Sequence, residues 1–136
     1  MYTVTTVMKE DNLFEATAGG QTVSMDTDGQ TQAQSPMELL LSAVSGCASV
    51  DVIEIIKKKR RTVNGLSITV GADRREEPWP RIFTAIRLHF VLDSPDATEK
   101  ELGQAVSLSM DKYCSVAGML REAATIDYTW EVTARS

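Results

Sequence analysis

Two cysteines, Cys47 and Cys114, carry the most readily defined chemistry in this chain, which has no others. The thiolate form of cysteine is the nucleophile and the species that is oxidised, so two neighbouring thiols can cycle between a dithiol and a disulfide. In isolation, each cysteine is more typical of a small buried hydrophobe. Cys114 departs from that reading because a short helix predicted over 116–123, with Ser115 as its cap, would place this thiol at a helix N-terminus. A helix N-terminus lowers the pKa of a thiol.

Composition excludes several other kinds of site. The two cysteines and the single His89 are too few for a zinc site at any familiar spacing, and we expect no metal and no cofactor. The net charge of -5 makes nucleic acid an unsuitable partner, because phosphate binding needs a basic surface. The basic run Lys57–Arg61 is the exception, and we interpret it as the solvated end of a helix.

The sequence favours a cytoplasmic protein. Its first residues, MYTVTTVMKEDN, contain no basic segment followed by an apolar one, so we expect no secretory signal. The cytoplasm keeps thiols reduced, so a permanent structural disulfide is not expected there. A content of 43% hydrophobic and 24% charged residues is typical of a soluble globular protein.

The element that must position Cys47 is a long predicted helix, which occupies most of the stretch Ser35–Arg61. Ser35 and Glu38 form an S-x-x-E capping box, and Pro36 suits the first helical position. Its residues are apolar on nearly all sides, which indicates burial on all sides. A membrane span would also be apolar, but the carboxylates of Glu38, Asp51 and Glu54 disfavour one. In so short a chain, a second subunit should cover part of this helix, which predicts a homodimer.

The remaining elements predict one α+β domain over 1–136 with a largely antiparallel sheet. A second capping box, Asp96 with Glu99, predicts a helix to about Met110, which Lys112–Ser115 interrupts. Hairpin signals at Gly19-Gly20 and alternating apolar residues in the longer strands support the rest. Strands are predicted over 2–8, 13–18, 21–25, 66–70, 82–92 and 126–133, and a polar loop over 26–34.

Two motifs resemble a known family. The segments SPMELLLSAVSGCASVDV and KYCSVAGML are similar to the two cysteine motifs of osmotically induced protein C and the organic hydroperoxide resistance protein (OsmC/Ohr). Pro36 and Cys47 have the family spacing, and Cys114-Ser115-Val116 matches the second motif. The segment EEPWPRIFTAIRLHFVL resembles the region between the cysteines. The resemblance extends over essentially the whole chain.

The resemblance implies an intertwined homodimer, in which antiparallel sheets wrap around two long central helices. It also implies a thiol-dependent reduction of organic hydroperoxides, with an external dithiol as the reductant. Cys47 would attack the peroxide and become a sulfenic acid, and Cys114 would resolve it as a disulfide. The two Cα atoms are therefore predicted to lie within about 7 Å of each other after modest movement.

The chain departs from the family pattern at two places. Met37 stands where the peroxidases have a catalytic glutamate, and Glu38 follows it. Glu38 is thus a candidate catalytic residue, although its role in the capping box accounts for it equally well. The N-terminal hairpin segment ATAGGQTVS lacks the family's thiolate-binding arginine. Arg81, Arg87 and Arg121 are the candidate replacements.

Three functions therefore remain open from the sequence. The first is an OsmC-like thiol peroxidase. The second is a redox-sensing or small-molecule-binding dimer with little peroxidase activity. The third is a dimeric scaffold in which the cysteines only pack.

Overall fold

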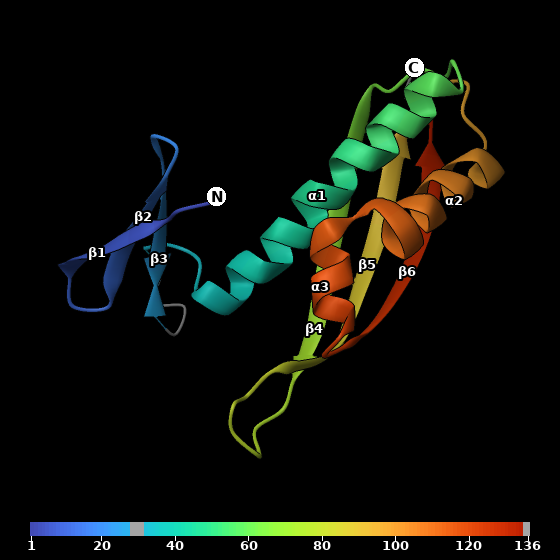
Figure 1. Ribbon diagram of the computed structural model, residues 1–136. Helices are drawn as coiled ribbons and strands as arrows, with labels where there is room; N and C mark the ends of the chain where they lie inside the picture. The colour runs from blue at the N-terminus through green and yellow to red at the C-terminus, as the bar shows by residue number, and fades with distance from the viewer. Residues whose placement is uncertain (28–31, 135–136) are drawn as a thin grey trace. The chain divides into compact units, whose positions relative to one another are not determined.

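The computed structural model describes residues 1–27 and 32–134 of the chain (Figure 1). It divides into two compact units, Met1–Leu41 and Ser42–Ser136, which are described separately. The single domain predicted over 1–136 stays a prediction. Residues 28–31 of the predicted polar loop lie outside the described residues.

The first unit contains a three-stranded antiparallel sheet in the order β1-β2-β3. Its strands are β1 (Thr5–Glu10), β2 (Leu13–Ala18) and β3 (Gln21–Asp26). Gly19 and Gly20 join β2 to β3 with φ of 55° and 80°, a left-handed conformation that glycine adopts without strain. The predicted Gly-Gly hairpin is thus confirmed.

The long helix α1 (Pro36–Lys58) begins and ends at local motifs. The Ser35 backbone N–H donates to Glu38 Oε1 at 2.9 Å, and the Glu38 N–H donates to Ser35 Oγ at 3.1 Å, which confirms the predicted capping box. At the other end Arg60 has a φ of 62°, and the Arg61 N–H donates to the Ile56 carbonyl at 3.2 Å. This is the hydrogen bond of a Schellman-type helix end, here without a glycine.

Only one stripe of α1 is covered by the chain itself. Its buried residues are Val44, Ala48, Val52 and Ile56, which follow one another at intervals of four. Val50, on another face, is 57% exposed. The expectation that α1 is buried on all sides therefore does not hold within a single chain. By length and composition alone α1 could cross a membrane, but core helices of soluble proteins have the same properties.

The second unit contains a mixed sheet in the order β4-β5-β6. Its strands are β4 (Gly65–Arg74), β5 (Phe83–Asp93) and β6 (Thr125–Thr133). β4 pairs with β5 antiparallel, but β6 pairs with β5 parallel. Both pairs of the first sheet are antiparallel, so the predicted α+β fold with largely antiparallel strands is confirmed, with this one parallel pair as the exception. The alternation predicted in β5 is confirmed, because one face of the strand is buried: Ile86, Leu88, Phe90 and Leu92.

Three helical segments follow β5 and lie, with α1, on one side of this sheet (Figure 1). They are α2 (Glu99–Leu108), the π-helical turn η2 (Ser109–Tyr113) and α3 (Ser115–Arg121). The capping box of α2 is formed by Thr98 and Glu101, so the predicted pair of Asp96 and Glu99 is wrong. The order of strands and helices along the chain agrees with the prediction.

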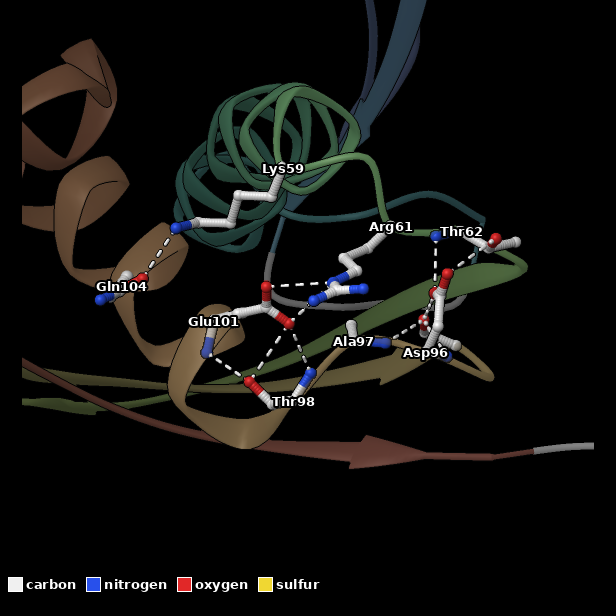
Figure 2. A network of polar contacts seen from close by, with 9 residues as sticks. Lys59, Arg61, Thr62, Asp96, Ala97, Thr98, Glu101 and Gln104 are labelled. Carbon is white, nitrogen blue, oxygen red and sulfur yellow. Dashed lines mark hydrogen bonds and ion pairs between the residues drawn. The ribbon is translucent and has the colours of Figure 1, made fainter.

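A network of polar contacts joins the end of α1 to the start of α2 (Figure 2). Lys59 Nζ donates to Gln104 Oε1 at 2.7 Å, and Arg61 Nε lies 3.0 Å from Glu101 Oε2. The Thr62 N–H donates to Asp96 Oδ1 at 2.8 Å, which explains why Asp96 does not cap the helix. Part of the basic run predicted to be solvated thus anchors α2, and the segment η2–α3 that follows α2 carries Cys114.

Candidate redox site

Cys47 lies about three turns into α1, at the edge of its buried stripe. Its neighbours Val44 and Ala48 are fully buried, whereas Cys47 itself is half-buried. A thiol in the middle of a regular helix is held rigidly, because its backbone N–H and carbonyl belong to the helical ladder. Cys47 is therefore the more accessible of the two thiols, and its position is fixed by α1.

Cys114 lies at the junction of η2 and α3. Its N–H donates to the Ser109 carbonyl at 2.7 Å, a bond that spans five residues and closes the π-helical turn. Its sulfur acts as the N-cap of α3 by accepting a hydrogen bond from the Ala117 N–H at 3.4 Å. Ser115 is thus the first residue of the helix and not its cap. The side chain of Cys114 is buried, with 4% exposure.

The structure brings the two cysteines together. The Cys114 thiol lies 3.9 Å from the Val44 carbonyl oxygen, one turn before Cys47 on α1, and Cys47 is close enough to raise the pKa of Cys114. Residues remote in sequence thus form one dithiol site within the second unit. An arrangement with the sulfurs on opposite sides of the core is excluded.

The environment of Cys114 disfavours its thiolate. Burial, opposed by the hydrogen bond from the Ala117 N–H, raises the pKa of Cys114 to about 11, and the neighbouring Cys47 and the charge of Asp51 act in the same direction. The predicted location at a helix N-terminus is confirmed, but the predicted lowering of the pKa is wrong. The stabilisation from the first turn of α3 is smaller than the cost of burying the charge.

Asp51 is a component of the site that the sequence analysis missed. It follows Cys47 by four residues and so occupies the same face of α1 one turn further on. Its Oδ2 accepts a hydrogen bond from Ser109 Oγ at 3.0 Å, and Ser109 is fully buried. Ser109 therefore contacts Asp51 through its hydroxyl and Cys114 through its carbonyl. The spacing from Cys47 was the signal that could have identified Asp51.

The three arginines predicted as candidate partners of Cys47 have other contacts. Arg81 lies over the Trp79 ring, 4.8 Å from its centroid, and Arg87 forms a bidentate ion pair with Asp73. Arg121 donates to the Met110 carbonyl. No cation is among the groups that shift the pKa of Cys114. Within residues 1–27 and 32–134, no three His, Cys, Asp or Glu side chains gather as a metal site would require.

Two further residues weighed in the sequence have structural contacts. Glu38 lies in the first turn of α1, and its carboxylate accepts the Ser35 N–H described above. His89 lies on the face of β5 opposite the buried residues, where its ring nitrogens contact Thr129 Oγ1 at 2.6 Å and Glu131 Oε1 at 3.1 Å. This agrees with the interpretation of His89 as a hydrogen-bonding residue of the sheet.

Comparisons with known proteins place this site in a wider context. Residues 28–129 match the family model described as OsmC-like protein. Protein YhfA of Escherichia coli (strain K12) is 42% identical over 117 residues, which cover 86% of this chain and 87% of YhfA. A hypothetical protein from Aquifex aeolicus VF5 superposes with a TM-score of 0.89 at 32% identity, covering 100% of this chain and 98% of that one.

A more distant structure shares the fold. It is the organic hydroperoxide resistance protein OsmC from Legionella pneumophila, with a TM-score of 0.72 at 13% identity, covering 96% of this chain and 98% of that one. At this identity the similarity concerns the fold alone.

Proposed function

Because this chain belongs to the family of OsmC-like proteins, we propose that it is a thiol-dependent peroxidase that reduces organic hydroperoxides. The observation that carries the proposal is the position of the Cys114 sulfur against α1, 3.9 Å from the Val44 carbonyl oxygen and one turn before Cys47. Two cysteines brought together from distant parts of a chain suit a dithiol–disulfide cycle.

In the proposed cycle, the Cys47 sulfur attacks the outer peroxide oxygen and the O–O bond breaks. The alkoxide takes up a proton and leaves as an alcohol, and Cys47 becomes a sulfenic acid. The Cys114 sulfur then attacks the Cys47 sulfur, a disulfide forms and water leaves. An external dithiol reduces this disulfide by two successive exchanges and is itself oxidised.

The roles of the two cysteines are assigned from their exposure. Cys47 is half-buried and can be reached by a small molecule, whereas Cys114 is buried behind it against α1. A resolving thiol needs to reach only the other cysteine. The reverse assignment would require the peroxide to reach the buried residue first.

Apolar side chains near both cysteines favour an organic peroxide over hydrogen peroxide. Val50 is 57% exposed, Tyr113 51% and Met119 77%, and each lies within a few residues of a cysteine. Such side chains would contact the alkyl group of a substrate. The same exposed surface supports a homodimer, because a monomer would leave these groups and much of α1 in water. We place this dimer in the cytoplasm, where dithiol reductants are available.

One specific observation favours a second function. Asp51 places a negative charge near the thiols, and the three candidate arginines have partners elsewhere. The charge of Asp51 disfavours a thiolate that persists before peroxide arrives, and none of these arginines offsets that charge at the thiols. A redox-sensing or ligand-binding dimer tolerates slow oxidation, whereas a rapid peroxidase does not.

The test is peroxide consumption by the purified protein with dithiothreitol and cumene hydroperoxide. We expect turnover faster than with dithiothreitol alone. Cys47→Ser should abolish it. In a single-turnover reaction without dithiothreitol, Cys114→Ser should stop at one sulfenic acid per chain, whereas the wild-type protein should form the disulfide. Because the chain has no third cysteine, each variant isolates one thiol. If the wild-type protein consumes peroxide no faster than the free dithiol, the peroxidase is rejected and the sensor or binding dimer takes its place.

A further inference from the structure

We propose that Asp51 accepts the proton of Cys114 when the two cysteines form their disulfide, and that Ser109 positions the Asp51 carboxylate for this step. The proposal rests on the proposed function for the assignment of Cys114 as the resolving thiol. It adds a proton acceptor to a site in which only the sulfurs had been assigned.

The geometry of Ser109 is the first argument. Its hydroxyl donates to Asp51 Oδ2 at 3.0 Å, while its carbonyl accepts the Cys114 N–H at 2.7 Å. Ser109 is fully buried, so water does not compete for either of these hydrogen bonds. One residue thus fixes both the backbone of the resolving cysteine and a carboxylate on α1. Asp51 and Cys47 are one helical turn apart, so the carboxylate, the hydroxyl and both thiols share one region.

The chemistry of Cys114 is the second argument. Burial makes Cys114 a poor source of thiolate at neutral pH, although its sulfur accepts a hydrogen bond from the Ala117 N–H. It needs a base within the site. Asp51 is the carboxylate whose charge acts on Cys114. A carboxylate oxygen can accept a proton while the sulfur attacks.

Both the proton of Cys114 and the hydroxide of the sulfenic acid have an acceptor in this step. Cys114 S–H gives its proton to Asp51 as its sulfur forms the S–S bond, and the S–O bond of the Cys47 sulfenic acid breaks. The departing hydroxide takes the proton from Asp51 and leaves as water. The carboxylate is regenerated, and no further oxidant or reductant is consumed.

The other charged groups close in sequence to Cys114 are engaged elsewhere. Asp111 Oδ2 accepts the Tyr128 hydroxyl at 3.0 Å, and Lys112 Nζ lies 5.2 Å from the centroid of the Tyr113 ring. Arg121 donates to the Met110 carbonyl. Cys47 and Asp51 are therefore the titratable groups that act on the Cys114 sulfur.

The experiment uses a step that needs no peroxide. Reaction of the reduced protein with one equivalent of 5,5′-dithiobis(2-nitrobenzoate) releases one coloured thionitrobenzoate in a first phase and leaves a second one bound to the accessible Cys47. Attack by Cys114 then expels coloured thionitrobenzoate, and its absorbance gives the rate of disulfide formation. We expect Asp51→Asn to lower this rate by about 10²-fold at pH 7.

The pH profile separates the proton acceptor from a purely electrostatic role. The wild-type rate should change little between about pH 6 and 9, because the proton acceptor lies within the site and the step does not need a preformed thiolate. In Asp51→Asn the rate of disulfide formation should rise about tenfold per pH unit, because the Cys114 thiolate must then form by loss of its proton to solvent. If Asp51 acted only through its negative charge, removing it would ease ionisation of Cys114 and the rate would increase. An equal or faster rate in Asp51→Asn overturns the proposal.

Two further variants keep the result interpretable. Glu54→Gln removes the same charge from an exposed position of α1 and should leave the rate unchanged. Ser109→Ala retains the carboxylate but not its hydrogen bond, so it should slow the step less than Asp51→Asn does. If Asp51→Asn does not fold, the Ser109→Ala profile decides, and an unchanged profile rejects the proposal. If Asp51→Asn slows the release of thionitrobenzoate as expected but the wild-type protein does not consume peroxide, the peroxidase is rejected. The role of Asp51 in disulfide formation is then still supported.

Discussion

The Cys114 thiol lies 3.9 Å from the carbonyl oxygen of Val44, one turn before Cys47 on α1. This contact ties the start of α3 to the middle of α1 and brings two sulfurs from distant parts of the chain together. This arrangement predicts measurable effects on disulfide formation, on the stability of the fold and on dimerisation.

Mild oxidation should join Cys47 to Cys114 within one chain. Closing so long a loop lowers the entropy of the unfolded chain, so the oxidised protein should be more stable by roughly 2–4 kcal/mol. Intact mass should show the loss of two hydrogen atoms, and guanidinium titration of both forms gives the difference in stability. Cross-linked dimers in place of an internal disulfide would contradict the assignment.

Cys114 should make the protein less stable in alkali. Its pKa is about 11 in the folded protein against an ordinary value of 9.0, so the unfolded chain releases this proton at lower pH than the folded one. The contribution is fully present below pH 9.0 and is lost as the pH rises through about 11. Urea unfolding of wild-type protein and Cys114→Ala across this range should differ in slope, with the variant falling less steeply. Parallel slopes would show that burial does not hold the thiol neutral.

Glu38 can be tested with two substitutions that separate its possible roles. Glutamine can replace glutamate in a capping box, so Glu38→Gln should remain stable, whereas Glu38→Ala should lose about 1 kcal/mol of unfolding free energy. Because the carboxylate accepts the Ser35 N–H, we expect Glu38→Gln to retain peroxide turnover. A large loss of turnover in Glu38→Gln, without a loss of stability, would instead identify a catalytic carboxylate.

The proposed homodimer should depend on the exposed apolar face of α1. Val50→Lys places a charge on that face and should shift light scattering from dimer to monomer at micromolar concentration, because obligate interfaces bury roughly 2,000 Å² or more of largely apolar surface. Val50→Thr has nearly the same shape without a charge and serves as the control. A wild-type monomer would refute the dimer directly.

The parts of the fold that are set by local pattern could be predicted from sequence. The Ser35–Glu38 capping box and the Gly19-Gly20 hairpin depend on residues within one turn, and both are confirmed. Asp96 misled the prediction because its carboxylate binds Thr62, a residue remote in sequence. The T-x-x-E pattern of Thr98 and Glu101 was present two residues later. The parallel pairing of β5 and β6 has no local signal at all.

The candidate site shows the same division. The two motifs predicted that Cys47 and Cys114 meet, but the pKa of Cys114 depends on burial, which only the packing against α1 determines. The position of Cys114 at the end of a helix can be predicted from the sequence, but the loss of water around its thiol cannot. Asp51 carried a readable spacing from Cys47, but its hydrogen bond to Ser109 depends on the π-helical turn.

Because of that turn, the two cysteines differ in how regular a backbone holds them. Cys47 is held in a regular α-helix of 23 residues, and moving it would require breaking the backbone hydrogen bonds of that helix. Cys114 follows the π-helical turn η2, in which the five residues Ser109–Tyr113 form a wider turn than they would in an α-helix. We therefore expect any adjustment that disulfide formation requires to fall on the irregular turn before Cys114 and not on the regular helix that holds Cys47.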